Sequence, residues 1–349
     1  MDDRIIGCIL GTAVGDAIGL PYEGLSRRRA SLLLGPPDRH RFLFGHGMVS
    51  DDTEHTCIVA QSLITANGDL SAFQESLAWR LRLWLLGIPA GIGIATLRST
   101  IRLWCGVSPE RSGVFSAGNG PAMRAAILGV SVRQRQVLHE WVRVSSQLTH
   151  ADPKAHFGAL AVALAAQMAA QRGNLSPNEF LAEIKECLNN DANDLLDLVA
   201  AAVSSVSRGE PTEQFADSLG LTNGVSGYIY HTVPVALHAC LAHSQDFRSA
   251  VMSVVRCGGD TDSTAAIVGG IVGASVGRAG IPKEWLTTLV EWPRTVSWME
   301  RLGSQLASTV TSDSRVCPIR QPALGVFFRN LFFLVIVFYH GFRRLAPPY

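Results

Sequence analysis

Residues 257–277 read Cys-Gly-Gly-Asp-Thr-Asp-Ser-Thr-Ala-Ala-Ile-Val-Gly-Gly-Ile-Val-Gly-Ala-Ser-Val-Gly, and this stretch decides the fold. The glycines at its start allow a close turn, and the apolar residues of 264–277 predict a buried helix. Glycines recur every four residues along that helix and give it a flat face for close packing. The turn before the helix can direct three oxygen-bearing side chains to one point: Asp260, Asp262 and Ser263.

A second acidic cluster lies much earlier in the chain. Ser50-Asp51-Asp52-Thr53-Glu54 follows the loop Gly45-His46-Gly47 and opens another predicted helix. Acidic side chains at a helix N-terminus are stabilised by the helix dipole, so capping alone explains one aspartate. Two adjacent aspartates with a hydroxyl on each side exceed what a cap requires. The cluster therefore indicates a further role.

Together the two clusters supply four carboxylates and two hydroxyls, all of them hard oxygen ligands. Such donors suit Mg²⁺ or Mn²⁺ rather than zinc. Two clusters at separate loop-to-helix junctions suit a pair of ions held between facing helices of a bundle. The sequence thus predicts two Mg²⁺ (or Mn²⁺) ions as cofactors.

The rest of the chain has the pattern of an all-α protein. Apolar residues recur at three- and four-residue spacing between Gly, Pro and Asn loops, and alternating β-branched runs are nearly absent. The helices that this pattern predicts are 4–19, 52–66, 73–86, 122–128, 154–170, 178–188, 193–207, 232–242, 247–255 and 264–277.

Composition narrows the class of protein. Of the 349 residues 47% are hydrophobic, and 30 Lys+Arg balance 29 Asp+Glu. Without a basic excess, no nucleic-acid partner is expected, and this hydrophobicity excludes a disordered chain. The seven cysteines form no CxxC pair, which argues against a zinc ribbon and fits reduced thiols in the cytoplasm.

Three parts are predicted: a compact domain over 1–306, a linker over 307–322 and a hydrophobic tail over 323–349. The tail contains an uninterrupted apolar and aromatic run, Leu331–Tyr339. A protein rarely exposes such a run, so the tail either docks on the domain or meets lipid.

The charges of the tail bear on this choice. Arg329 and the modest length argue against a full membrane span, and in a lipid setting Arg329 would lie near one end of the segment. Arg343 and Arg344 suit an anionic surface at the other end. We therefore favour an interfacial anchor, which makes the protein cytoplasmic with a membrane-associated tail.

Three further segments carry polar groups at helix ends. Glu23 follows the turn Gly15–Tyr22, and Gly118-Asn119-Gly120 is a glycine turn before a helix whose N–H groups can hold a phosphate. Thr149-His150-Ala151-Asp152 places a histidine and an aspartate before another helix. Each of these segments alone is more often structural than functional, since capping and turn formation explain it.

In this order, the segments resemble the ADP-ribosylglycohydrolase family. The matching residues are Gly15-Asp16-Ala17-Ile18-Gly19 with Glu23, Ser50-Asp51-Asp52-Thr53, Gly118-Asn119-Gly120, Thr149-His150-Ala151-Asp152, Gly227-Tyr228 and Gly259-Asp260-Thr261-Asp262-Ser263. They span nearly the whole predicted domain. The resemblance implies an orthogonal all-α bundle with a dinuclear metal cleft.

The resemblance also implies roles for single residues. Gly118, Asn119 and Gly120 match the loop that contacts the diphosphate and distal ribose, and His150 matches a residue beside bound ADP-ribose. Glu23 matches a flap glutamate, and the general base is Glu23, Asp51 or Asp262. Ser50 and Ser263 stand where family members usually have Thr, which keeps the hydroxyl. The matched metal ligands are Ser50, Asp51, Asp52, Asp260, Asp262 and Ser263.

One departure bears on the substrate. The run Pro89-Ala90-Gly91-Ile92-Gly93 has Gly91 where relatives that act on ADP-ribosylarginine carry an aspartate.

Three functions are compatible with the sequence. The first is a metal-dependent hydrolase that cleaves the glycosidic bond of an ADP-ribosyl group. The second is a catalytically inert relative that binds ADP-ribose or a nucleotide, and the third is a two-metal phosphatase. The complete ligand set favours the hydrolase, whereas Gly91 favours the inert relative. The acceptor stays open among arginine, serine and other groups.

Overall fold

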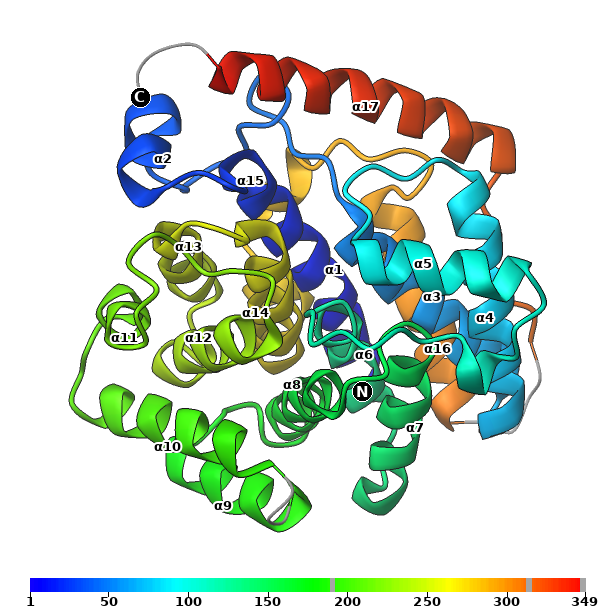
Figure 1. Ribbon diagram of the computed structural model, residues 1–349, viewed down its shortest axis with the longest axis horizontal. Helices are drawn as coiled ribbons and strands as arrows, with labels where there is room; N and C mark the ends of the chain where they lie inside the picture. The colour runs from blue at the N-terminus through cyan, green and yellow to red at the C-terminus, as the bar shows by residue number, and fades with distance from the viewer. Residues whose placement is uncertain (189–191, 312–315, 346–349) are drawn as a thin grey trace.

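The computed structural model describes residues 1–188, 192–311 and 316–345. Within these ranges the chain forms seventeen α-helices and no β-strand, so the all-α prediction is confirmed (Figure 1). The helices are α1 Asp2–Gly19, α2 Arg27–Leu34, α3 Asp51–Ala66, α4 Leu70–Leu86, α5 Ile94–Trp104, α6 Ala126–Ser131, α7 Arg135–Gln147, α8 Pro153–Arg172, α9 Pro177–Leu188, α10 Asn193–Ser207, α11 Thr212–Ser218, α12 Ile229–Ala242, α13 Phe247–Cys257, α14 Thr261–Val276, α15 Lys283–Thr287, α16 Val296–Thr311 and α17 Ala323–Arg344.

The centre of the molecule is the pair α1 and α14. Both helices are buried around most of their circumference, because nearly all of their side chains are apolar or small. Their backbones touch along a ladder of glycines: a methyl group at Gly11 would overlap the carbonyl oxygen of Gly269, and one at Gly7 that of Gly273. The close packing predicted from the four-residue glycine spacing is thus confirmed.

The predicted helices are present, with shifts at their ends. α14 begins at Thr261 rather than 264, which places Asp262 and Ser263 inside its first turn. The helix predicted over 122–128 is divided into a 3-10 turn, Ala122–Arg124, and the short α6. The pattern missed several helices outside the inner core, among them α5, α7 and α16.

The predicted domain boundary at 306 falls inside a helix of the structure. Position 306 lies inside α16, which continues to Thr311. After the undescribed residues 312–315 the chain is held to the domain by side chains. The Gln305 side chain accepts a hydrogen bond from the Ile319 N–H at 2.9 Å and donates one to the Cys317 carbonyl at 2.7 Å. Gln61 donates to the Ile319 carbonyl at 2.7 Å.

The tail forms α17, which docks on the domain along one edge of the molecule (Figure 1). Its inward side carries polar groups that bind the domain. Asn330 donates to the Gly87 carbonyl at 2.8 Å, and the His340 ring lies 2.7 Å from the Phe42 carbonyl. Phe333 packs on the Phe42 ring at a centroid distance of 5.2 Å. The tail is therefore not a free segment.

Arg329 does not lie at a lipid boundary, contrary to our expectation. It is buried in an ion cluster with Glu54, Glu291 and Arg294. Its guanidinium lies 2.7 Å from the Glu291 carboxylate and donates to the Val49 carbonyl at 2.6 Å. Opposite charges in this buried position fix α17 on the loop before α3.

In the described ranges two helical segments are long and apolar enough to cross a bilayer, Asp2–Tyr22 and Ala323–Arg344. The first contains the core helix α1, and 94% of its apolar 18-residue window is buried inside the protein. The second is α17, and only 28% of its corresponding window is buried.

Candidate active site

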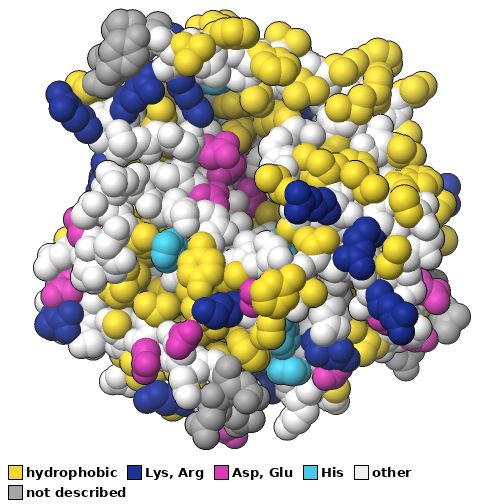
Figure 2. All heavy atoms as spheres, in the orientation of Figure 1, with side chains coloured by type: hydrophobic (Ala, Val, Ile, Leu, Met, Phe, Trp, Pro, Cys, Tyr) yellow, Lys and Arg dark blue, Asp and Glu magenta, His cyan; other side chains and the backbone are white. Residues whose placement is uncertain are grey.

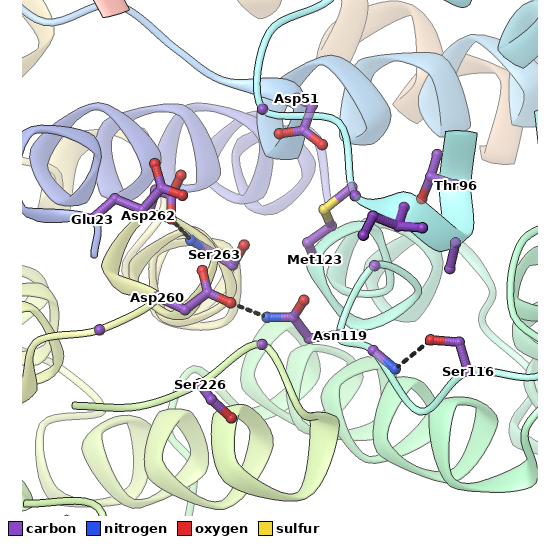
Figure 3. Close-up of a pocket in the computed structure, with 18 of the residues that line it drawn as sticks. Glu23, Asp51, Thr96, Ser116, Asn119, Met123, Ser226, Asp260, Asp262 and Ser263 are labelled. Atoms are coloured by element: carbon purple, nitrogen blue, oxygen red, sulfur yellow. Dashed lines mark hydrogen bonds between the residues drawn. The ribbon is translucent and has the colours of Figure 1, made fainter. Parts of the chain in front are cut away.

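A cleft of about 550 Å³ opens beside the N-terminal ends of α3 and α14 (Figure 3). Figure 2 shows carboxylates at the bottom of a hollow on this face of the molecule. Seven separate stretches of chain line the cleft, counting His150 as one, and each contributes residues singled out in the sequence or close neighbours of these. The stretches are 23–24, 51, 91–96, 116–123 with His150, 225–227 and 259–263.

The first acidic cluster forms the start of α3. Ser50 is the N-cap, and its hydroxyl accepts from the Asp52 N–H at 3.3 Å and donates to the Asp52 carboxylate at 3.0 Å. Asp52 is buried, while Asp51 points into the cleft (Figure 3). Capping thus accounts for Ser50 but leaves both carboxylates available for other contacts.

The second cluster forms the start of α14. The Asp260 N–H donates to the Val225 carbonyl at 2.7 Å, which fixes the turn against the loop 225–227. The Asn119 amide donates to the Asp260 carboxylate at 2.7 Å. The Ser263 hydroxyl lies 3.3 Å from the Asp52 carboxylate, so the two clusters meet directly.

The carboxylates of the two clusters raise one another's pKa. Burial is the largest cause and raises the pKa of Asp51, Asp52 and Asp262 well above the usual range. Neighbouring negative charges add to the effect, since bringing like charges together disfavours ionisation. In their ionised forms these carboxylates would repel one another.

Glu23 lies at the mouth of the cleft after the turn that ends α1. Enclosure by the cleft walls and the charge of Asp260 raise the pKa of Glu23, and the Arg344 guanidinium of α17 opposes the rise. Figure 3 shows the Glu23 and Asp262 carboxylates side by side. Arg344 is held there by donating to the Pro21 carbonyl at 3.1 Å.

Asp16 belongs to a matching segment of the sequence, but no role in the site was predicted for it. It lies fully buried in α1, and its carboxylate accepts from the Ser50 N–H at 2.9 Å and from the Thr53 hydroxyl at 2.5 Å. Burial raises the pKa of Asp16 to about 7, although these donated hydrogen bonds act against the rise. An aspartate inside an otherwise apolar helix was the available clue. Asp16 holds the start of α3 in place.

The donor set fits magnesium or manganese by its chemistry. All six predicted ligands are oxygen donors, and one Asp52 oxygen is buried without a hydrogen-bond partner. Within the described residues no three His, Cys, Asp or Glu side chains already surround one point as a metal-holding group. Asp52 and Asp260 instead accept hydrogen bonds from the Ser50 hydroxyl and the Asn119 amide.

The glycine turn 118–120 lies against the His150 ring. A Cβ at Gly120 would lie 2.8 Å from the ring carbon Cε1, and one at Gly118 would lie 3.1 Å from Nε2. Both glycines are therefore needed for the turn to reach the histidine. The expected phosphate cradle is altered, because the Asn119 N–H donates to the Gly227 carbonyl at 2.9 Å and a 3-10 turn follows instead of a helix N-terminus.

A buried arginine supports this end of the cleft. Arg124 donates to the Thr149 hydroxyl at 2.7 Å, and this hydroxyl lies 2.9 Å from Nδ1 of His150. Burial and the Arg124 charge lower the pKa of His150 to about 3, so the ring is neutral near pH 7. The cleft thus has an acidic end, formed by the clustered carboxylates, and a neutral end, formed by the His150 ring and supported by the buried Arg124.

Gly91 lies in the cleft wall close to the first cluster. A Cβ at this position would lie 3.5 Å from the Asp51 carboxylate. Its φ of +80° is one that side chains rarely adopt. The loop therefore adds no carboxylate to the cleft at this point.

Comparison with known proteins places the chain in a family. The ADP-ribosylglycohydrolase family model matches residues 1–315, and the chain belongs to this family. The match ends before α17. An uncharacterised protein of Archaeoglobus fulgidus is 33% identical over 88% of this chain and 96% of its own.

Two named relatives and one solved structure agree with this placement. ADP-ribosyl-[dinitrogen reductase] glycohydrolase of Rhodospirillum rubrum is 28% identical, covering 82% of this chain and 90% of its own. Human ADP-ribosylhydrolase ARH3 is 29% identical, covering 81% and 88%. A solved ADP-ribosylglycohydrolase-related protein complex aligns with a TM-score of 0.66 and 25% identity, over 88% of this chain and 98% of that chain.

Proposed function

We propose that this protein hydrolyses the glycosidic bond between an ADP-ribosyl group and its acceptor, with two Mg²⁺ or Mn²⁺ ions as cofactors. One observation carries the proposal: a single cleft joins the clustered carboxylates to the glycine turn on His150. The named relatives are hydrolases of ADP-ribosyl groups, and the chain shares their family.

The acidic end would hold the ions. Their ligands would be Ser50, Asp51, Asp52, Asp260, Asp262 and Ser263. Bound ions of this kind orient sugar hydroxyls and polarise water. The protein prepares the set by fixing both helix starts, through Asp16 on α3 and the Val225 carbonyl on α14.

Glu23 is the carboxylate best placed to accept a proton. It lines the cleft, it lies beside Asp262, and it is outside the proposed ligand set. Its raised pKa brings it closer to neutral pH, where a general base works well. Asp51 and Asp262 are the other candidates, but as ion ligands they would be held in the ionised form.

The other end of the cleft would hold the ADP part. Gly118 and Gly120 bring the main chain against the neutral His150 ring, which leaves a flat wall for the sugar and diphosphate. The buried Arg124 cation beneath Thr149 adds a positive charge that favours a diphosphate over a neutral group.

Gly91 suggests that the acceptor is not a guanidinium. One relative, of Serratia proteamaculans, is named as an ADP-ribosylarginine hydrolase. A cationic acceptor is best held by a carboxylate near the bond that breaks. Here the loop beside Asp51 offers Gly91, so we expect a neutral leaving group such as a serine hydroxyl.

The test is release of ADP-ribose from serine-linked and arginine-linked substrates, with Mg²⁺ and with EDTA. Asp262→Asn removes one ligand charge and should lower turnover by about 10²-fold or more. Asp246→Asn is the matched control, because Asp246 caps α13 outside the cleft. Full activity of Asp262→Asn, or full activity in EDTA, would contradict the metal-dependent hydrolase. ADP-ribose binding without any turnover would support the inert relative instead.

A further inference from the structure

The outward side of α17 has the reverse of the usual pattern for a surface helix. Its polar residues Arg329, Asn330 and His340 face the domain and bind it. Its solvent side is a stripe of apolar side chains, 52 to 74% exposed and spaced three or four residues apart. They are Leu324, Phe328, Phe332, Val335, Phe338 and Phe342.

An aromatic loop tip extends this apolar surface. Phe44 stands in a tight turn with a positive φ of 48° and is 96% exposed. The turn borders a groove of about 670 Å³, whose far side is formed by α17 residues including Val335 and Tyr339. Figure 2 shows hydrophobic side chains gathered over α17 along the upper edge of the molecule.

The groove is cationic. Arg39, Arg41, Arg343 and Arg344 line it, and among the described residues no carboxylate does. Of these, Arg41 pairs with Asp38 at 3.0 Å, and Asp38 does not line the groove. Within α17 itself the sequence contains no Asp or Glu.

From these features we propose that α17, with Phe44 and the arginine groove, docks on an anionic lipid surface. The apolar stripe would enter the headgroup–acyl boundary while the exposed Arg39 and Arg343 meet lipid phosphates. The helix would lie in the interface rather than span it, because its polar side is bound to the domain.

Lipid suits this surface better than a protein does. The six-residue stripe offers no hydrogen-bonding side chain, whereas protein interfaces carry about one hydrogen bond per 100–200 Å². A second copy of α17 brings no carboxylate for the arginines, since the helix has none. An anionic bilayer supplies both an apolar layer and negative charge.

The test is cosedimentation of the full chain with vesicles of equal parts phosphatidylglycerol and phosphatidylcholine, against vesicles of phosphatidylcholine alone. Val335→Glu together with Phe338→Glu should weaken binding to the mixed vesicles by about tenfold or more. Val137→Glu adds one glutamate at an exposed position of α7, away from α17, and should bind as the unaltered protein does.

Salt provides a second measurement. Raising it from about 0.1 M to about 1 M shortens the screening length from about 10 Å to about 3 Å, and binding should fall several-fold. Unaltered sedimentation of the double variant, or no preference for phosphatidylglycerol, would overturn the proposal. So would a dimer in light scattering that the double variant loses, because a second copy would then cover the stripe. Circular dichroism checks that both variants keep their helices.

Discussion

At the scale of single residues, the buried ion cluster under α17 links the tail to the active site. Arg294 lies 2.8 Å from Glu54, and Arg329 lies 2.7 Å from Glu291. Glu54 lies in the first turn of α3 with Asp51 and Asp52, and the Val49 main chain contacts both Glu291 and Arg329. Two acids and two bases balance in charge, so removing one base leaves an uncompensated buried carboxylate.

This gives a first prediction. Arg329→Met keeps much of the side-chain volume but leaves Glu54 and Glu291 with Arg294 alone. It should lower the free energy of unfolding by about 3–5 kcal/mol. Urea denaturation measures the change, and Arg98→Met on the exposed face of α5 is the control, expected within about 0.5 kcal/mol. Equal stability of the two variants would show that the cluster does not hold α17 in place.

Part of the site is readable from the sequence, and part is not. The two acidic clusters stand out because adjacent hydroxyls and carboxylates after glycine turns exceed what capping needs. Asp16 and Arg329 carry no such local pattern, because their partners lie 34 and 38 residues or more away in sequence. A buried charge in an apolar run shows that a partner exists without showing which one.

At the scale of elements, the glycine ladder sets the distance between α1 and α14. Each glycine in a helix costs about 1 kcal/mol relative to alanine, so neither helix is favoured by its own composition. Their stability comes from the contact itself, which places the turn with Glu23 beside Asp262. A small outward shift of either helix would move one half of the site away from the other.

A second prediction follows from the ladder. Gly11→Ala puts a methyl group against the Gly269 carbonyl and should destabilise the protein by about 3 kcal/mol. Gly341→Ala is the matched control, because a Cβ there meets nothing within 4 Å. That control should raise the stability slightly, by about 0.5–1 kcal/mol. Thermal unfolding followed by circular dichroism compares them, and a neutral Gly11→Ala would refute the close-packing argument.

Helix prediction succeeded where the core made the pattern strong. α1, α3 and α10 are found within two residues of their predicted bounds, since long apolar repeats mark them. The start of α14 was placed late because its first turn is polar, and polar residues there serve the site rather than the core. The sequence left open whether the tail docks or meets lipid. The polar residues of α17 face inward, and periodicity rules assume the opposite.

At the scale of the whole molecule, the clustered carboxylates make stability depend on pH. Unfolded aspartates ionise near pH 4, whereas folded Asp16 keeps its proton up to about pH 7. The folded state therefore binds more protons in this window, and stability should fall as pH rises from about 4 to about 7. Asp51, Asp52 and Asp262 act in the same direction.

A third prediction adds the cation. Mg²⁺ binds the ionised carboxylates of the folded state, so it should raise the Tm of the metal-free protein more at pH 8 than at pH 5. Differential scanning fluorimetry with Mg²⁺, against NaCl of equal ionic strength, makes the measurement. An equal Tm rise at both pH values, or an equal effect of NaCl, would contradict a metal site built from these residues.

The pairing of α1 with α14 also sets when the core of this protein can form during synthesis. The Thr261 hydroxyl bonds to the Gly19 carbonyl, and 242 residues separate them. At about 5–20 residues per second, a ribosome leaves α1 waiting for about 10–50 s without its partner. A nascent chain that ends before α14 therefore lacks one side of the cleft, and its apolar helix α1 lacks the helix it packs against. Such a fragment lacks Asp260 and Asp262, so it cannot assemble the four clustered carboxylates.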